Sequence, residues 1–257
     1  MKPVLFYLGE FPVYSYTFFI LIGLFIAVPG VIIRRKQENL TLFDCIYLGM
    51  LCFISGVIFA KIFSFISQFP YSISKFTSIL LFFRKGFSFH GALVGVFLAI
   101  FYFSKETKRD FLKILDLIAP FGCLSYAIGR FGCYFNGCCY GIKTNSILSV
   151  NFINSPYIQD KLSSYHPVQL YDSYLSFLLF LFLLEYKKKF KGEIFLLFLL
   201  GNSLIRFFVE YFRWGVSAKV VAGFITQAQI ASIVIIIISI YLIKRKKGEK
   251  NEIFKDS

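Results

Sequence analysis

Charged residues are scarce in this sequence: Asp, Glu, Lys and Arg make up 16% of its 257 residues, against about a quarter in a typical soluble domain. Hydrophobic residues make up 57%, and 35 residues are Phe. So few charges cannot cover the surface of a soluble enzyme, and so many apolar residues exclude a disordered chain. The same shortage of polar surface excludes a secreted disulfide scaffold. The composition predicts an all-α integral membrane protein.

Long apolar runs supply the membrane-spanning elements, since roughly 20 apolar residues cross the hydrocarbon core of a bilayer. Seven runs are found, of which the third and fourth are short. They are residues 14–33, 43–67, 89–103, 112–128, 166–185, 194–212 and 222–243. We expect about seven transmembrane helices in a single helical domain over residues 1–247, followed by a polar cytoplasmic tail over residues 248–257.

Acidic residues are half as numerous as basic ones, 14 against 28, which gives a net charge of +14. The basic residues gather in four clusters, and each cluster follows an odd-numbered run: they lie at 34–36, 105–109, 187–191 and 244–247. Because basic loops stay cytoplasmic and rest on anionic lipid, the N-terminus is predicted outside and the C-terminus inside. No stacking module or basic groove is visible, so nucleic acid is not expected as a partner.

Only two histidines occur, and both fall at the predicted outer start of a membrane run. They are His90 and His166. Histidine suits proton transfer near neutral pH, because its ordinary pKa is about 6.5. The alternative for each is a hydrogen-bonded helix cap without a catalytic role.

Charged residues inside the apolar runs must be paired or face a wet cavity. Arg206, Glu210 and Arg213 share one helical face, since they are spaced by four and three residues. They form either a structural triad or, with one positive charge in surplus, a site for an anion such as a phosphate. Asp116 and Asp172 are further intramembrane acids that could pair with Arg130 or Arg206.

Residues 129–141 contain four glycines, which are expected to end the fourth helix and to allow close approach of a ligand. Arg130 lies at this predicted junction, and its planar guanidinium can bind a phosphodiester through two hydrogen bonds.

This segment resembles the signature of the prolipoprotein diacylglyceryl transferases, Gly-Arg-x-Gly-Asn-Phe-x-Asn-x-Glu-x-x-Gly. The matching residues are Gly129, Arg130, Gly132, Asn136 and Gly141. Residues 88–91, 166–172 and 206–213 resemble three further motifs of the family, and Tyr16 and Asp116 fit its first-helix tyrosine and its acid before the signature. The resemblance covers essentially the whole chain in order.

The resemblance implies a multi-pass enzyme of the bacterial plasma (inner) membrane with its active site toward the outer face. The family transfers the diacylglyceryl group of phosphatidylglycerol to the lipobox cysteine of a prolipoprotein, which forms a thioether and releases glycerol 1-phosphate. No cofactor and no metal is implied, and the partners are these two substrates and membrane lipids.

The same resemblance suggests roles for individual residues. We expect His90 to assist the proton, Arg130 and Arg206 to bind the phosphate, and Glu210 to orient Arg206. Tyr16 and Asn136 would hydrogen-bond the headgroup. The remaining residues expected at the substrate site are Asp116, Gly141, His166, Gln169 and Tyr171.

The chain departs from the family pattern at its cysteines. Cys133 and Cys138 stand where the signature has Asn and Glu, and Cys139 follows directly. On an oxidising face they could form a disulfide, with a histidine they could bind a soft metal, or they could be free substituted residues. A related transferase with another acceptor, or a non-enzymatic metal or redox membrane protein, are the alternative functions.

Overall fold

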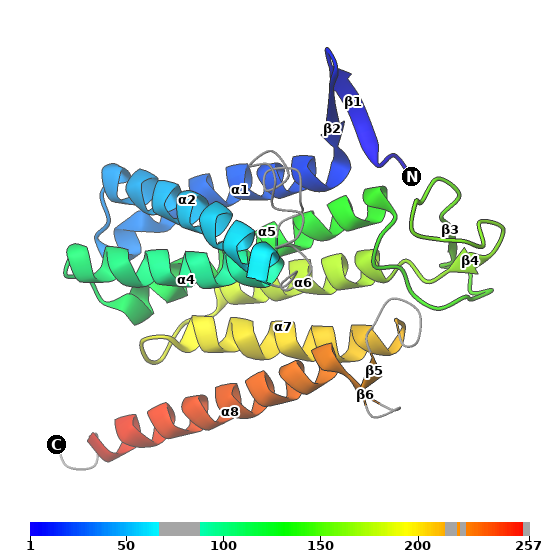
Figure 1. The fold of residues 1–257 in the computed structure, drawn as a ribbon. Helices are drawn as coiled ribbons and strands as arrows, with labels where there is room; N and C mark the ends of the chain where they lie inside the picture. The colour runs from blue at the N-terminus through cyan, green and yellow to red at the C-terminus, as the bar shows by residue number, and fades with distance from the viewer. Residues whose placement is uncertain (67–87, 214–219, 222–224, 254–257) are drawn as a thin grey trace. The chain divides into compact units, whose positions relative to one another are not determined.

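The computed structural model describes residues 1–66, 88–213, 220–221 and 225–253, and this part of the chain is mostly helical. Its helices are α1 (Ser15–Arg34), α2 (Leu42–Ile66), α4 (Phe89–Glu106), α5 (Phe111–Asn136), α6 (Val168–Glu185), α7 (Glu193–Tyr211) and α8 (Gln227–Ile253), with a 3-10 turn at Arg35–Glu38. Three antiparallel hairpins pair β1 (Val4–Leu8) with β2 (Phe11–Tyr14), β3 (Val150–Asn151) with β4 (Ser164–Tyr165), and β5 (Val220–Val221) with β6 (Ile225–Thr226) (Figure 1). The predicted all-α class is confirmed.

Six helices in the described residues are long and apolar enough to cross a membrane: α1, α2, α5, α6, α7 and α8. Half of the apolar window of α5 is buried inside the protein, against 11% for α1. This difference marks α5 as the most enclosed of the six and α1 as a helix whose side chains are left for lipid. The count of seven spans and the orientation of the termini stay predictions.

Helix α5 does not end at residue 128, although the glycines of residues 129–141 predicted that it would. It continues eight residues beyond Ile128 to Asn136, so Arg130 lies inside the helix. Glycine is tolerated there because it permits close helix packing: a Cβ atom on Gly132 would lie 3.1 Å from the Phe19 Cβ and 3.2 Å from the Tyr16 Cα. The helix instead stops at Gly137, whose φ of +75° is left-handed.

Helix α8 begins later and ends later than its apolar run. Thr226 and Gln229 exchange side-chain-to-backbone hydrogen bonds of 3.0 and 3.2 Å, a capping box that fixes the start. Past the basic cluster, Glu249 pairs with Arg245 and Lys246 at 3.1 and 2.9 Å. These pairs favour helix, so the backbone of residues 248–253 is helical rather than an irregular tail.

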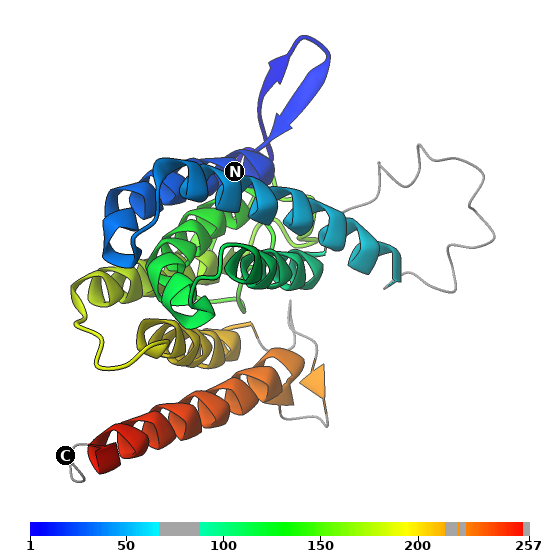
Figure 2. The same ribbon diagram turned by 90° about the vertical axis from the view of Figure 1, so that its left-hand side faces the viewer.

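The chain divides into two compact units, residues 1–30 with 116–257, and residues 31–115. In the first unit α7 packs beside both α6 and α8, as both ribbon views show (Figures 1 and 2). Ser173 of α6 donates a hydrogen bond of 2.8 Å to the carbonyl of Ala127 in α5. These contacts hold the C-terminal half of α5 against α6.

The second unit is built on α2 and α4. Gly91 and Gly95 of α4 lie one turn apart and face α2 so closely that a Cβ on either would be 2.3 Å from a backbone oxygen, of Phe59 and Ser55 respectively. Small residues at this spacing let membrane helices pack backbone to backbone.

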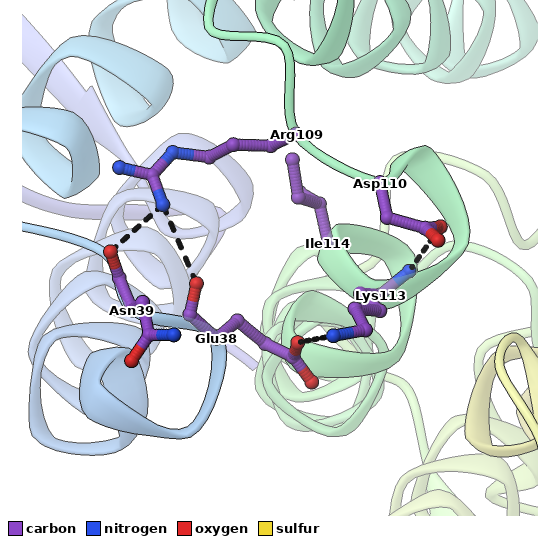
Figure 3. Close-up of a pocket in the computed structure, with 6 residues that line it drawn as sticks. All are labelled: Glu38, Asn39, Arg109, Asp110, Lys113 and Ile114. Carbon is purple, nitrogen blue, oxygen red and sulfur yellow. Dashed lines mark hydrogen bonds and ion pairs between the residues drawn. The ribbon is translucent and has the colours of Figure 1, made fainter.

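Arg109 joins the turns of this second unit (Figure 3). It donates hydrogen bonds to the carbonyls of Asn39 at 2.7 Å and Glu38 at 3.4 Å, and to the Asp44 carboxylate at 2.7 Å. Lys113 pairs with Glu38 at 3.7 Å across the same small hollow. Arg109 belongs to a basic cluster expected to rest on lipid, but it instead ties the turn before α5 to the turn before α2.

Candidate functional site

The end of α5, the start of α6 and the end of α7 meet within the first unit (Figure 1). The Gly141 amide donates to the His166 carbonyl at 3.0 Å, and the Ile142 amide donates to the Phe212 carbonyl at 2.7 Å. A Cβ on Gly141 would lie 2.6 Å from the Phe212 oxygen and 2.8 Å from the His166 Cβ. Gly141 therefore allows these segments to approach one another, and its expected place at the substrate site stays a prediction.

Arg130 is held by α5 and α6 together. Its Nη2 lies 2.6 Å from Oδ2 of Asp172, and its Nη2 and Nε donate to the Tyr126 hydroxyl at 2.6 and 3.0 Å. The same hydroxyl donates to Asp172 at 3.0 Å. The Arg130 side chain is 13% exposed and that of Asp172 is 2% exposed. Pairing with a buried acid makes a charge at this depth tolerable.

Arg206 on α7 extends this cluster. Its Nη2 pairs with Glu210 at 2.8 Å, its Nη1 lies 3.8 Å from Asp172, and Glu210 also pairs with Arg213 at 3.0 Å. The predicted shared face of Arg206, Glu210 and Arg213 is confirmed, as is Asp172 as a partner of both Arg130 and Arg206. We call Arg130, Asp172, Arg206, Glu210 and Arg213 the arginine cluster.

The arginine cluster carries one positive charge in surplus, since three arginines face two carboxylates. Among the described residues, the buried Nη1 of Arg206 and Oδ1 of Asp172 have no hydrogen-bond partner. A buried donor without a partner costs about 1–3 kcal/mol. A cluster with surplus positive charge and an unused N–H group is suited to bind an anion.

Three residues expected at the substrate site come together at the start of α6. Nδ1 of His166 lies 3.0 Å from the Tyr171 hydroxyl, and its ring packs edge-on against Phe212, with the centroids 5.1 Å apart. The buried Gln169 donates to the Cys138 carbonyl at 2.6 Å. His166 is thus positioned by two neighbours, and Gln169 anchors the loop that follows α5.

Tyr16 and Asn136 lie around the end of α5. Tyr16, at the start of α1, is close enough to Arg130 and to the thiols after it for their charges to act on its hydroxyl. Asn136 is the last residue of α5 and donates to the Tyr157 hydroxyl at 3.3 Å. Both polar side chains therefore lie near the C-terminal end of α5, which carries Arg130.

The cysteines of the signature form a compact group. The sulfur atoms of Cys133, Cys138 and Cys139 all lie within 4.8 Å of one another, and all three are free thiols. Hydrogen bonds from Cys133 and Cys138, together with the nearby charges of Arg213 and Arg130, hold the pKa of the Cys139 thiol well below its ordinary value. Sequence spacing left the proximity of the three open, and the structure brings them together.

The family model for prolipoprotein diacylglyceryl transferase matches residues 3–245. The chain belongs to this family. A phosphatidylglycerol–prolipoprotein diacylglyceryl transferase of Clostridium tetani is 32% identical over 94% of this chain and 96% of its own. Relatives of the same name in Clostridium perfringens (transferase 2) and Staphylococcus aureus are 32% and 30% identical, over 97% and 98% of this chain and 98% and 91% of their own.

Asp116 does not pair with Arg130 or Arg206 in the structure. It lies 14 residues before Arg130 on α5, a rise of about 21 Å along the axis. Its carboxylate accepts hydrogen bonds from the amides of Gly192 and Phe195 at 2.8 and 3.0 Å and pairs with Lys188 at 3.6 Å. Asp116 therefore caps α7, and the expected pairing with Arg130 or Arg206 is wrong.

His90 lies in the first turn of α4, in the second unit. Its side chain lies outside the described residues, so its role as the proton acceptor stays a prediction.

Tyr126 is a residue of this candidate site that the sequence analysis missed. Its position four residues before Arg130 places both on one helical face, and this spacing was the available signal. In the structure the hydroxyl bridges Arg130 and Asp172, and the Arg130 guanidinium lies 4.9 Å from the Tyr126 ring centroid. Tyr126 fixes the orientation of the guanidinium.

Proposed function

We propose that this chain transfers the diacylglyceryl group of phosphatidylglycerol to the lipobox cysteine of prolipoproteins. Family membership and the names of its relatives support both substrates. The observation that carries the proposal is the buried arginine cluster, with its surplus charge and the unused N–H of Arg206. A phosphodiester is the monoanion that would neutralise it.

In the proposed reaction the acceptor sulfur attacks the glyceryl carbon that bears the phosphate. The carbon–sulfur bond forms, the carbon–oxygen bond breaks, and the electron pair leaves on glycerol 1-phosphate. Negative charge builds on the departing oxygen, and positioned donors that meet such charge are often the largest catalytic contribution. Arg130 and Arg206 supply these donors, while Asp172 and Glu210 hold them in place.

The remaining groups have supporting parts in this proposal. Tyr16 and Asn136, near the C-terminal end of α5, hydrogen-bond the glycerol headgroup, and His166 with Tyr171 faces the acceptor. His90 takes the thiol proton.

We further propose that the enzyme lies in the bacterial plasma membrane with the arginine cluster toward the outer face. The distribution of basic loops supports an outer N-terminus and a cytoplasmic C-terminus. A reporter fused after Lys247 is expected in the cytoplasm, and one inserted at Asn145, in the loop after α5, is expected outside. Finding both on one side would contradict this orientation.

The activity is tested directly with the purified chain in vesicles that contain labelled phosphatidylglycerol. A synthetic lipobox peptide should gain the mass of a diacylglyceryl group, and glycerol phosphate should appear in equal amount. The matched control is the same peptide with its cysteine replaced by serine, which should remain unmodified. Failure to modify the cysteine peptide, together with failure to complement a strain depleted of its own transferase, would exclude the proposal.

A further inference from the structure

The three thiols at the end of α5 have the dimensions of a metal site. A zinc ion bound tetrahedrally at about 2.3 Å holds its sulfur ligands roughly 3.8 Å apart. The sulfur atoms of Cys133, Cys138 and Cys139 already lie within 4.8 Å of one another, so a contraction of about 1 Å would close the site.

The backbone is shaped to make the three sulfurs converge. Adjacent side chains usually point apart, but Gly137 and Cys139 both have left-handed φ values, +75° and +60°. The Cys138 amide donates to the Cys133 carbonyl at 3.2 Å, which folds the loop back onto the last turn of α5.

Neighbouring residues fix this loop from outside. Ser155 donates to the Gly137 carbonyl at 2.8 Å, and a Cβ on Gly137 would lie 2.7 Å from the Ser155 Cβ, so only glycine fits. The buried Gln169 donates to the Cys138 carbonyl at 2.6 Å. The loop is held by two elements far away in sequence.

Charge also favours a divalent ion at this place. Three thiolates with one Zn²⁺ carry a net charge of −1, and the arginine cluster carries +1. Arg130 and Arg213 are close enough for their charges to act on Cys139. Without a bound substrate the two groups together are neutral, which reduces the cost of placing either one at the membrane.

Three protein ligands leave the fourth tetrahedral position open, as in catalytic rather than structural zinc sites. Cys133 is buried, whereas Cys138 and Cys139 are partly exposed, so the open position can be reached from outside the protein.

We propose that Cys133, Cys138 and Cys139 bind one Zn²⁺ whose fourth position takes the sulfur of the lipobox cysteine. The inference rests on the proposed function for the identity of this thiol. A thiol that coordinates zinc loses its proton more readily, here to His90, the base of the proposed function. The bound thiolate attacks the glyceryl carbon, the carbon–sulfur bond forms, and the carbon–oxygen electron pair leaves with glycerol phosphate. In this proposal the metal activates the acceptor thiol. Its ligands Cys133 and Cys138 occupy the two positions at which the family signature has Asn and Glu.

The first test measures the metal itself. The full chain, purified in detergent with a reductant and stripped by a chelator, should take up one Zn²⁺ per chain by elemental analysis. Co²⁺ used as a probe should give thiolate-to-metal charge-transfer absorption. Cys133→Ser and Cys139→Ser should each weaken metal binding by more than the 10–100-fold typical of a lost outer-shell partner. Cys52→Ser, which removes a thiol from α2, is the matched control and should bind as the parent does.

The second test measures whether the sulfur of the lipobox cysteine coordinates the metal. Adding a lipobox peptide to the Co²⁺ form should change the absorption, and the serine peptide should not. A chelated protein that transfers at the full rate, a disulfide among the three cysteines in protein taken from membranes, or equal metal binding by Cys139→Ser and Cys52→Ser would each overturn the zinc proposal. Stoichiometric Zn²⁺ without transfer to any lipobox peptide would instead count against the proposed function.

Discussion

The chain uses partly buried arginines in two different ways, seen by comparing Arg109 with the arginine cluster. Arg109 donates to two backbone carbonyls and one carboxylate, so most of its hydrogen bonds hold the turns of its own unit (Figure 3). Arg130 and Arg206 are paired with side chains only among the contacts described above. A backbone carbonyl cannot be displaced without unfolding a turn, whereas side-chain partners can share a guanidinium with a ligand.

The two regions also differ in the sign of their charge. Of the charged residues that line the hollow at Arg109 or pair with Arg109, two are cations and three are acids, which are Asp44, Glu38 and Asp110, so their charges sum to −1. The arginine cluster sums to +1. Each region has one buried nitrogen without a hydrogen-bond partner in the described residues, but in Arg109 it is the inner Nε, while in Arg206 it is the terminal Nη1. The comparison assigns Arg109 to the fold and supports the proposal that the arginine cluster binds an anionic ligand.

The largest effect should come from Arg130→Lys. Lysine keeps the charge but loses the planar fork, and charge-assisted hydrogen bonds contribute about 1.5–3 kcal/mol, or more than tenfold in rate. We expect transfer from labelled phosphatidylglycerol to fall at least about tenfold, with expression and membrane insertion unchanged. Undiminished transfer would show that Arg130 only anchors the helix and would move the phosphate site to Arg206.

A smaller effect is expected from Tyr126→Phe. The ring stays under the guanidinium, but the hydroxyl that bridges Arg130 and Asp172 is lost. A neutral hydrogen bond contributes about 0.5–1.5 kcal/mol, so transfer should fall about two- to tenfold. The matched control is Tyr174→Phe, which removes an exposed hydroxyl from α6 in the same unit. Equal rates for Tyr126→Phe and the parent would mean that Asp172 alone orients Arg130.

The residues of the arginine cluster show which features of the site could be predicted from the sequence. The spacing of Arg206, Glu210 and Arg213 predicted their shared face, and the cost of an unpaired acid in a membrane predicted a partner for Asp172. Both arguments need only helix geometry and charge. The family motifs likewise depend on order along the chain alone.

Features that depend on packing between helices were not predictable. The end of α5 was placed too early because glycine breaks helices in water, whereas Gly132 here admits α1. Asp116 could not be assigned to the cap of α7 without the position of Gly192. The convergence of three sulfurs depends on the left-handed backbone of Gly137 and Cys139, which composition does not reveal.

Arg109→Lys should leave transfer intact and lower stability. Lysine cannot reach the carbonyls of Glu38 and Asn39 and the Asp44 carboxylate together, and each lost hydrogen bond costs about 1 kcal/mol. We expect a lower melting temperature in detergent and an unchanged rate per folded enzyme. A rate that falls as far as in Arg130→Lys, at an unchanged melting temperature, would remove the distinction between the two arginine regions.

The smallest effect is expected at the exposed pair of Lys143 and Asp160, in the loop between α5 and α6. The hydrogen bond from Lys143, aided by that from Ser163, holds the pKa of Asp160 below its ordinary value. A lowered pKa stabilises the fold above the unfolded value of about 3.9, and this contribution is lost only as the pH falls through the folded value. Exposed pairs contribute little, because water screens them and both side chains lose freedom. Melting temperatures of Asp160→Asn and the parent should therefore coincide between about pH 5 and pH 8. A clear separation in that range would mean that this loop pair, and not only the arginine cluster, stabilises the region at the C-terminal end of α5.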